Sequence, residues 1–246
     1  MQPTYLPWLG YFALIDAVDT FVFLDSVQFD RRSWQQRNQI KNVDAPMWLT
    51  IPVQGKGRYA EEISKILIDR SSKFQRKHIG SIKQVYKKAP FFEQYGESVL
   101  NVLSKPYENL ADLTVDLIET LSGMLGIKVN FLRSSNLSVT GSKADLLAEI
   151  CEAVNATEYI SPTGAACYLQ QSDAFSARGI KVLYNDYQHP EYKQLKMPFM
   201  PFMSVLDLLF NEGPNSLKII RSGAKLVSAS EVELQLQSAE ILNGTT

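Results

Sequence analysis

The chain has 246 residues, of which 45% are hydrophobic and 21% are charged, and this composition excludes a disordered or fibrous protein. Lys and Arg number 25 against 26 Asp and Glu, so the basic excess that is typical of nucleic-acid binders is absent and we expect no nucleic-acid partner. Two cysteines are too few for a disulfide scaffold or a cysteine zinc site. No apolar run approaches the roughly 18 residues of a membrane span, and prolines interrupt the start, so we expect a cytoplasmic protein.

The first third of the chain predicts a shaped loop, a short helix and three strands. Residues 2–10 place large apolar side chains among two prolines and a glycine, which favours a loop. Residues 11–17 suit a short helix, and residues 21–24 form a short apolar run that suits a buried strand. Further strands are predicted at residues 48–53 and, more weakly, at residues 65–69.

Helical spacing of apolar residues dominates the middle of the chain, at residues 74–86, 92–102 and 110–124. The last stripe is the clearest, and Gly126 is placed to end it. We therefore expect a helical insertion or subdomain at about residues 74–125.

Strands and helices then alternate, which favours an α/β fold with parallel pairing. The predicted strands are 129–132, 159–160 and 180–184, and the predicted helices are 142–154, 164–178 and a last one that Ser204 caps. We expect a Rossmann-like parallel sheet core in one domain, residues 1–223, followed by a weakly structured tail, residues 224–246.

Polar side chains follow the predicted strands, where open α/β sheets bind their ligands. Asp25 and Gln28 follow the first strand, Ser161 opens the turn SPTGAA, and His189 follows the strand at 180–184. We expect Asp25, Ser161 and His189 to line one cleft, with Asp25 and His189 transferring protons and Ser161 contacting an anion. The alternative is that these polar residues reflect only the usual polarity of surface loops and form no site. The other histidine, His78, lies among helical positions and is interpreted as having a structural or surface role.

The segment 30–41, DRRSWQQRNQIK, concentrates arginines around a tryptophan. Arginine binds phosphate or carboxylate through two parallel hydrogen bonds, and an aromatic ring can stack on a sugar or base. A solvated surface segment is the alternative. The residues that we predict to bind substrate are Tyr5, Trp8, Gln28, Arg32, Trp34, Arg37, Asn38 and Ser161. No P-loop, metal-ligand set or other cofactor motif is present, so the sequence names no cofactor.

Several segments in order resemble the WbqC-like family of bacterial proteins. They include QPTYLPWLGYF, DTFVFLDSVQF, RRSWQQRNQI, MWLTIPV, YISPTGAACYL, YQHPEYKQ and MPFMSVLDLLFNEG, and together they cover roughly residues 2–220. Family members occur with bacterial surface-polysaccharide genes, so the resemblance implies a role in O-antigen and lipopolysaccharide biosynthesis. It also implies transfer of glycine or a similar acyl group to a sugar. Family members usually begin with an apolar strand before the Gln-Pro, whereas Met1 precedes Gln2 here, so we expect an empty position beside the sheet.

Three functions stay open. The first is a transferase that modifies an activated sugar, with a small-molecule partner such as a nucleotide sugar. The second is nucleotidyl transfer to a small metabolite with magnesium, because the strand, proline loop and Trp8–Tyr11 segment resemble the start of HxGH nucleotidyltransferases without their histidines. The third is a non-catalytic binding protein of the same pathway, since no nucleophile motif is recognisable.

Overall fold

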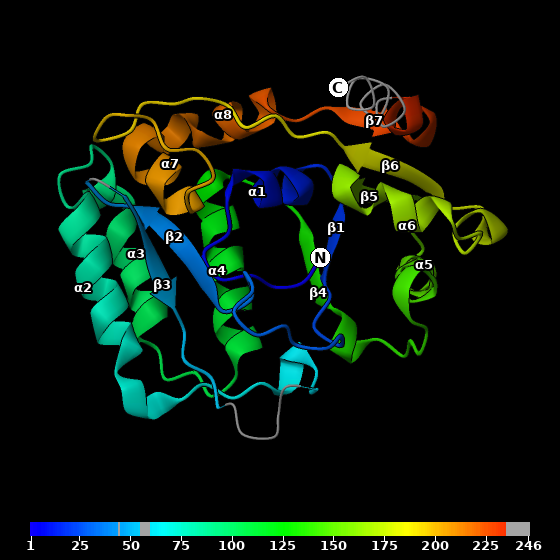
Figure 1. Cartoon of the computed structure of the whole chain (residues 1–246), viewed down its shortest axis with the longest axis horizontal. Coiled ribbons are helices and arrows are strands. Elements are labelled where there is room, and N and C mark those ends of the chain that lie inside the picture. The colour runs from blue at the N-terminus through cyan, green and yellow to red at the C-terminus, as the bar shows by residue number, and fades with distance from the viewer. Residues whose placement is uncertain (44, 55–59, 235–246) are drawn as a thin grey trace, which may run out of the picture. The chain divides into compact units, whose positions relative to one another are not determined.

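The computed structural model describes residues 1–43, 45–54 and 60–234, and the chain divides into two compact units (Figure 1). Unit 1 comprises Met1–Ser135 and His189–Ser222. Unit 2 comprises Asn136–Gln188 and Gly223–Thr246. Within the described residues, no helix is long and apolar enough to cross a membrane.

Unit 1 is built around a layer of helices. The helices of unit 1 are α1 (Leu9–Asp16), α2 (Phe74–Tyr86), α3 (Phe92–Ser104), α4 (Leu110–Leu125), α7 (Val205–Glu212) and α8 (Ser216–Ser222). Helix α3 packs against α2, α4 and α7, and α1 packs against α8 (Figure 1). Apolar side chains at 110, 113, 117 and 121 of α4 are fully buried, and Gly126 ends this helix with a φ of 79°. The three helices predicted between 74 and 125 are thereby confirmed.

Two small sheets complete unit 1. Strand β1 (Thr20–Phe23) pairs in parallel with β4 (Asn130–Arg133), and the backbone of Met1 hydrogen-bonds to Val22 and Leu24 beside β1. Strand β2 (Arg37–Lys41) pairs antiparallel with β3 (Pro46–Thr50). The strand predicted at 65–69 is wrong: a 3₁₀ turn (Ile63–Lys65) precedes isolated bridges at Leu67 and Ile68. These residues bond to loops and to the start of α4, so no continuous ladder forms.

Unit 2 has its own core and its own sheet. Strands β5 (Glu158–Pro162) and β6 (Lys181–Asn185) pair in parallel, and β7 (Leu226–Ser228) pairs antiparallel with β6. Helices α5 (Lys143–Ala153) and α6 (Ala166–Gln170) accompany them. The core joins side chains of both helices to Phe175, Tyr184 and Val227.

Unit 2 differs from the sequence expectation at one helix and at the C-terminal segment. The helix predicted at 164–178 is present only at Ala166–Gln170 (α6). After it, the Ala174 backbone N–H donates to the Ser172 hydroxyl, which starts a separate turn. Local side-chain bonds of this kind compete with helix propagation. The segment predicted as a tail includes β7, while residues 235–246 lie outside the described part of the chain.

The fold class is α/β, as predicted, but a Rossmann-like core is not confirmed. Parallel pairing among the described strands is limited to β1–β4 in unit 1 and β5–β6 in unit 2. The predicted strands are therefore mostly present, but the described chain arranges them in three small sheets.

The N-terminal loop packs its apolar side chains into unit 1. Tyr5, Leu6 and Leu9 are fully buried, as expected for a loop of this composition. Trp8 is partly buried. Its ring stacks on His189 with an interplanar angle of 10° and contacts Phe202, and it crosses directly over Gly10 in α1.

The close approach of Trp8 to Gly10 generates a prediction. A Cβ at position 10 would lie 2.3 Å from the Trp8 indole, well inside contact distance, so Gly10→Ala must displace the ring. We expect a loss of about 1–3 kcal/mol in the free energy of unfolding, measured by urea denaturation. Gly123→Ala in α4 is the matched control, because its Cβ meets nothing within 4 Å and alanine favours a helix. Equal stabilities of the two variants would contradict this packing.

Candidate functional site

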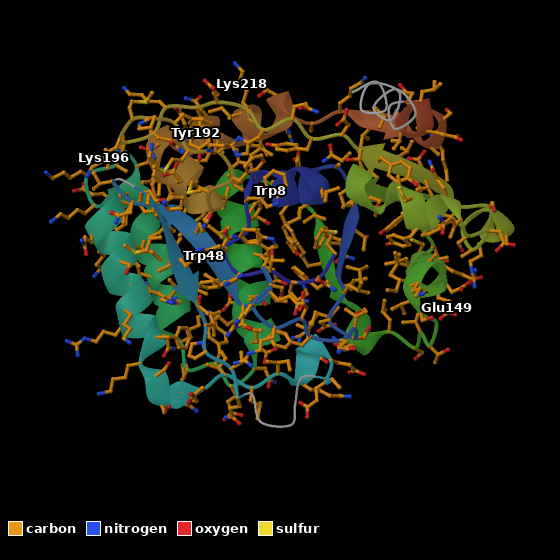
Figure 2. All side chains as sticks on the ribbon, viewed as in Figure 1. Trp8, Trp48, Glu149, Tyr192, Lys196 and Lys218 are labelled. Atoms are coloured by element: carbon orange, nitrogen blue, oxygen red, sulfur yellow. The ribbon has the colours of Figure 1, made fainter. Side chains whose placement is uncertain are left out.

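The β2–β3 hairpin and the turn that precedes it carry an arginine–tryptophan platform, defined here as Trp34, Arg37 and Trp48. The indole rings of Trp34 and Trp48 lie 5.5 Å apart and are 51% and 43% exposed. The Arg37 guanidinium carbon sits 4.4 Å above the centre of the Trp48 ring. The sheet alternation explains this exposure, because Asn38 and Leu49 face the interior whereas Arg37 and Trp48 occupy the outward positions of β2 and β3. Figure 2 labels Trp48 on this hairpin.

The other end of β2 carries a buried polar cluster around Lys41, which is 4% exposed. The Lys41 ammonium donates to Gln194 Oε1 at 2.7 Å, to the Pro198 carbonyl at 2.6 Å and to the Lys196 carbonyl. Gln194 in turn donates through Nε2 to Asp207 Oδ2 at 2.8 Å. Gln194 therefore links a buried cation to a buried anion, and we call this set the Lys41 cluster.

Asp207 in α7 is 1% exposed and also accepts a hydrogen bond from Tyr192 at 2.9 Å. Burial raises the pKa of Asp207, while hydrogen bonds from Tyr192, Tyr86 and Gln194 oppose that rise. Burial likewise lowers the pKa of Lys41, and the charge of Asp207 opposes that change. Each charge therefore depends on the cluster to remain ionised away from water.

A small cavity of about 160 Å³ adjoins the cluster. Its lining combines Lys41, Tyr86 and Asp207 with the neighbouring Leu195 and Lys196. The remaining lining residues come from the end of β2 and the last turn of α2, namely Asn42, Val43, Gln84 and Val85.

Polar groups after β1 and β4 do converge, as the sequence predicts for parallel strand ends. Asp25 is fully buried, and its carboxylate accepts from Arg133 Nε at 2.6 Å and from both hydroxyls that follow, Ser134 and Ser135. The Ser135 backbone N–H donates as well, at 2.9 Å. Arg133 also bonds to Asp112. Strong donors thus occupy both carboxylate oxygens of Asp25. This arrangement suits a role for Asp25 in positioning Arg133.

His189 lies in unit 1 with both ring nitrogens engaged. The Phe202 backbone N–H donates to Nε2 at 3.1 Å, so the proton resides on Nδ1, which is 2.9 Å from the Pro190 carbonyl. Burial lowers the pKa of His189, which favours the neutral ring. The rings of Trp8, Tyr192, Phe199 and Phe202 surround it.

Two of the predicted binding residues are part of the interior. Tyr5 is fully buried and its hydroxyl lies 2.8 Å from Nδ1 of His78, and burial raises the pKa of Tyr5. Asn38 is 2% exposed and bonds to the backbone of Leu6 and Gln39. His78 is 5% exposed, so of the structural and surface roles considered for it, the surface role is wrong.

The remaining predicted residues are distributed between the units. Gln28 and Arg32 are exposed in unit 1, and Arg32 has a left-handed backbone with φ of 63°. Ser161 is buried in β5 of unit 2, whereas Asp25 and His189 belong to unit 1. The single cleft that joins all three therefore stays a prediction. Among the described residues, no group of three or more His, Cys, Asp or Glu could hold a metal ion.

Sequence reasoning missed Trp48, two members of the Lys41 cluster, Gln194 and Asp207, and Tyr86, which lines the adjoining cavity. One signal was available for Asp207, because a single carboxylate inside the apolar run VLDLLF must be buried and therefore bonded. Lys41 stood in the charged segment 30–41, where nothing distinguished it from its exposed neighbours.

The His78 environment predicts a pH dependence. Burial lowers the pKa of His78 from 6.5 to about 4, so the unfolded chain takes up a proton there before the folded one does. Stability from this group is complete above pH 6.5 and is lost as the pH falls toward 4. We expect the wild type to lose about 3 kcal/mol more than His78→Gln across this window, by urea denaturation. Parallel pH profiles of the two proteins would contradict a buried neutral imidazole.

The Lys41 cluster predicts a large cost for removing its cation. Lys41→Met leaves Asp207 buried without a cation and leaves two backbone carbonyls without their donor. We expect a loss of about 3–5 kcal/mol in the free energy of unfolding. Lys128→Met, at an exposed lysine, should change stability by less than about 0.5 kcal/mol. A similar small effect at both positions would show that Lys41 does not stabilise the fold.

Comparisons with known proteins agree with the resemblance seen in the sequence. The chain is 34% identical over 223 residues to "Uncharacterized protein Rv1507c" of Mycobacterium tuberculosis, and the match covers 90% of this chain and 96% of that protein. No solved structure matches the chain. A family model described as "WbqC-like protein family" matches residues 2–219. The chain therefore belongs to the WbqC-like protein family.

Proposed function

We propose that this chain is a cytoplasmic enzyme of bacterial surface-polysaccharide biosynthesis that modifies an activated sugar by glycyl or acyl transfer. The pathway comes from what the family resemblance implies. The activated sugar is inferred as the substrate from one observation, the arginine–tryptophan platform of Trp34, Arg37 and Trp48. In such a transfer, an oxygen of the sugar bonds to the acyl carbon, the carrier leaves with the bonding electron pair, and the hydroxyl proton passes to a base.

The platform combines the two features that a nucleotide sugar needs. Two indole rings, 51% and 43% exposed, offer flat apolar faces on which a sugar or base can stack. The adjacent guanidinium of Arg37 provides a planar fork for a diphosphate. Its position 4.4 Å above Trp48 restricts the arginine, so less side-chain entropy is lost when a ligand binds.

Of the two residues predicted to transfer protons, we assign proton transfer to His189 and a positioning role to Asp25. His189 is half-buried and neutral, and release of the Phe202 N–H from Nε2 would free that nitrogen to accept a proton. Asp25 holds Arg133 and two serines with all of its lone-pair directions in use. Within this proposal, His189 is the base and Asp25 acts by fixing the side chain of Arg133.

Ligand binding distinguishes the proposal from its rivals. Thermal unfolding is followed with nucleotide sugars, with nucleoside triphosphates plus magnesium, and with free amino acids, because a ligand of the folded state raises the melting temperature. A shift with nucleotide sugars supports the proposed enzyme. A shift with triphosphate that requires magnesium favours nucleotidyl transfer, and no shift with any ligand favours a non-catalytic binding protein.

Arg37 provides the sharpest prediction for the platform. Arg37→Lys keeps the charge but loses the planar fork, so we expect about a tenfold weaker affinity for the nucleotide sugar and an unchanged melting temperature. Trp34→Ala should weaken binding by a similar factor, since this ring is half exposed and its loss leaves the core intact. Affinity is measured by calorimetry. Arg31→Lys, an exposed arginine in the preceding loop, is the matched control.

One outcome would contradict ligand binding at the platform. If Arg37→Lys lowers the melting temperature and leaves affinity unchanged, the arginine stabilises the hairpin through Trp48 and the ligand binds elsewhere.

A further inference from the structure

Helix α2 concentrates positive charge in a chain whose net charge is −1. Between residues 73 and 92 there is no acidic residue, whereas six basic ones are present and all six are exposed. They are Lys73, Arg76, Lys77, Lys83, Lys87 and Lys88. No ion pair among the described residues involves any of them.

The basic residues share one side of the helix. At 100° per residue, Arg76, Lys77, Lys83 and Lys87 fall within an arc of about 120°. The opposite side holds the buried residues Phe74, His78, Ile82 and Tyr86. Helix α2 packs against α3, which packs against α4, and α2 lies at the outer edge of this layer (Figure 1).

An apolar segment lies beside the end of this helix. Residues 195–202 read LKMPFMPF, and we call them the apolar loop. Met197 is 76% exposed, Phe202 55% and Leu195 36%. Leu195 and Lys196 share a cavity wall with Gln84, Val85 and Tyr86 at the end of α2, so the loop and the basic helix are neighbours within unit 1. Figure 2 shows Lys196 at the periphery.

The exposure of the apolar loop is built into the structure. Lys41 binds the carbonyls of Lys196 and Pro198, and Gln194 binds both the N–H of Met200 and its carbonyl. The loop backbone is thereby held toward the interior while large side chains remain in water. Phe202 adds a second sign of constraint, because its φ of 61° is unusual for a bulky residue.

From this arrangement we propose that unit 1 docks on an anionic lipid surface through α2 and the apolar loop. Exposed apolar side chains beside lysines are the pattern that anchors peripheral proteins at the membrane interface, where the apolar groups insert and the cations meet lipid headgroups. Apolar side chains favour lipid over nucleic acid, and the unpaired excess of positive charge favours an anionic surface over a neutral one. This inference is independent of the proposed function.

Vesicle co-sedimentation tests the docking surface. The full chain is mixed with vesicles of phosphatidylcholine alone, and with vesicles of phosphatidylcholine and phosphatidylglycerol in equal parts. We expect binding to the anionic vesicles to be at least about tenfold stronger and to weaken as salt is added. Equal binding to both vesicles, or binding to neither, would overturn the proposal.

Two variants separate the charge from the apolar insertion. Lys83→Glu with Lys87→Glu, and separately Met197→Ser, should each weaken binding to the anionic vesicles by at least about fivefold. All three side chains are exposed, so the melting temperature should not change. The matched controls are Lys128→Glu with Lys225→Glu, and Leu234→Ser, which alter exposed residues outside α2 and the loop and should bind as the wild type does.

A polyanion arm distinguishes lipid from nucleic acid. Duplex DNA is offered in place of vesicles under the same conditions. If the DNA binds as tightly as the anionic vesicles do and Met197→Ser has no effect on either, the basic helix recognises polyanions in general and the lipid proposal is wrong.

Discussion

The burial of one lysine organises much of unit 1. Lys41 ends β2 and is covered by carbonyl groups of the segment that leads to α7, and Gln194 connects it to Asp207 in that helix. A buried cation is tolerated only when its donors are matched with acceptors, so the chain between 194 and 198 must pass close to the hairpin. The path of the apolar loop and the lining of the neighbouring cavity both follow from this requirement.

Helices and strands with a strong apolar periodicity could be predicted from sequence. Elements that form only through contacts with distant segments of the chain could not. The stripe of α4 and the cap of α7 by Ser204 follow from local rules, and the structure has both. Strand β2 gave no such signal, because Asn38 takes an inward position and is satisfied there by the backbone of Leu6, a contact between distant segments. The arrangement of strands into small sheets likewise depends on long-range pairing that no local pattern encodes.

The candidate site divides in the same way. Trp34 and Arg37 stood out in sequence because aromatic and guanidinium groups were mixed in one segment, and the structure brings them together with Trp48 through the pairing of β2 and β3. Tyr5 and Asn38 looked similar in sequence but are buried, since burial depends on what covers a residue. Asp25 met its partners after β4, as parallel strand ends require, and those partners occupy it fully.

Strand β2 therefore joins two surfaces, with the arginine–tryptophan platform at one end and the support of the apolar loop at the other. The central claim is that Lys41 fixes this loop, and amide hydrogen exchange of the peptide spanning residues 194–204 tests it most directly. In the wild type, the Met200 amide bonds to Gln194 and should exchange slowly, whereas in Lys41→Met this peptide should exchange at least about tenfold faster while α4 remains protected. Unchanged exchange in the variant would contradict the claim that the buried lysine holds the loop.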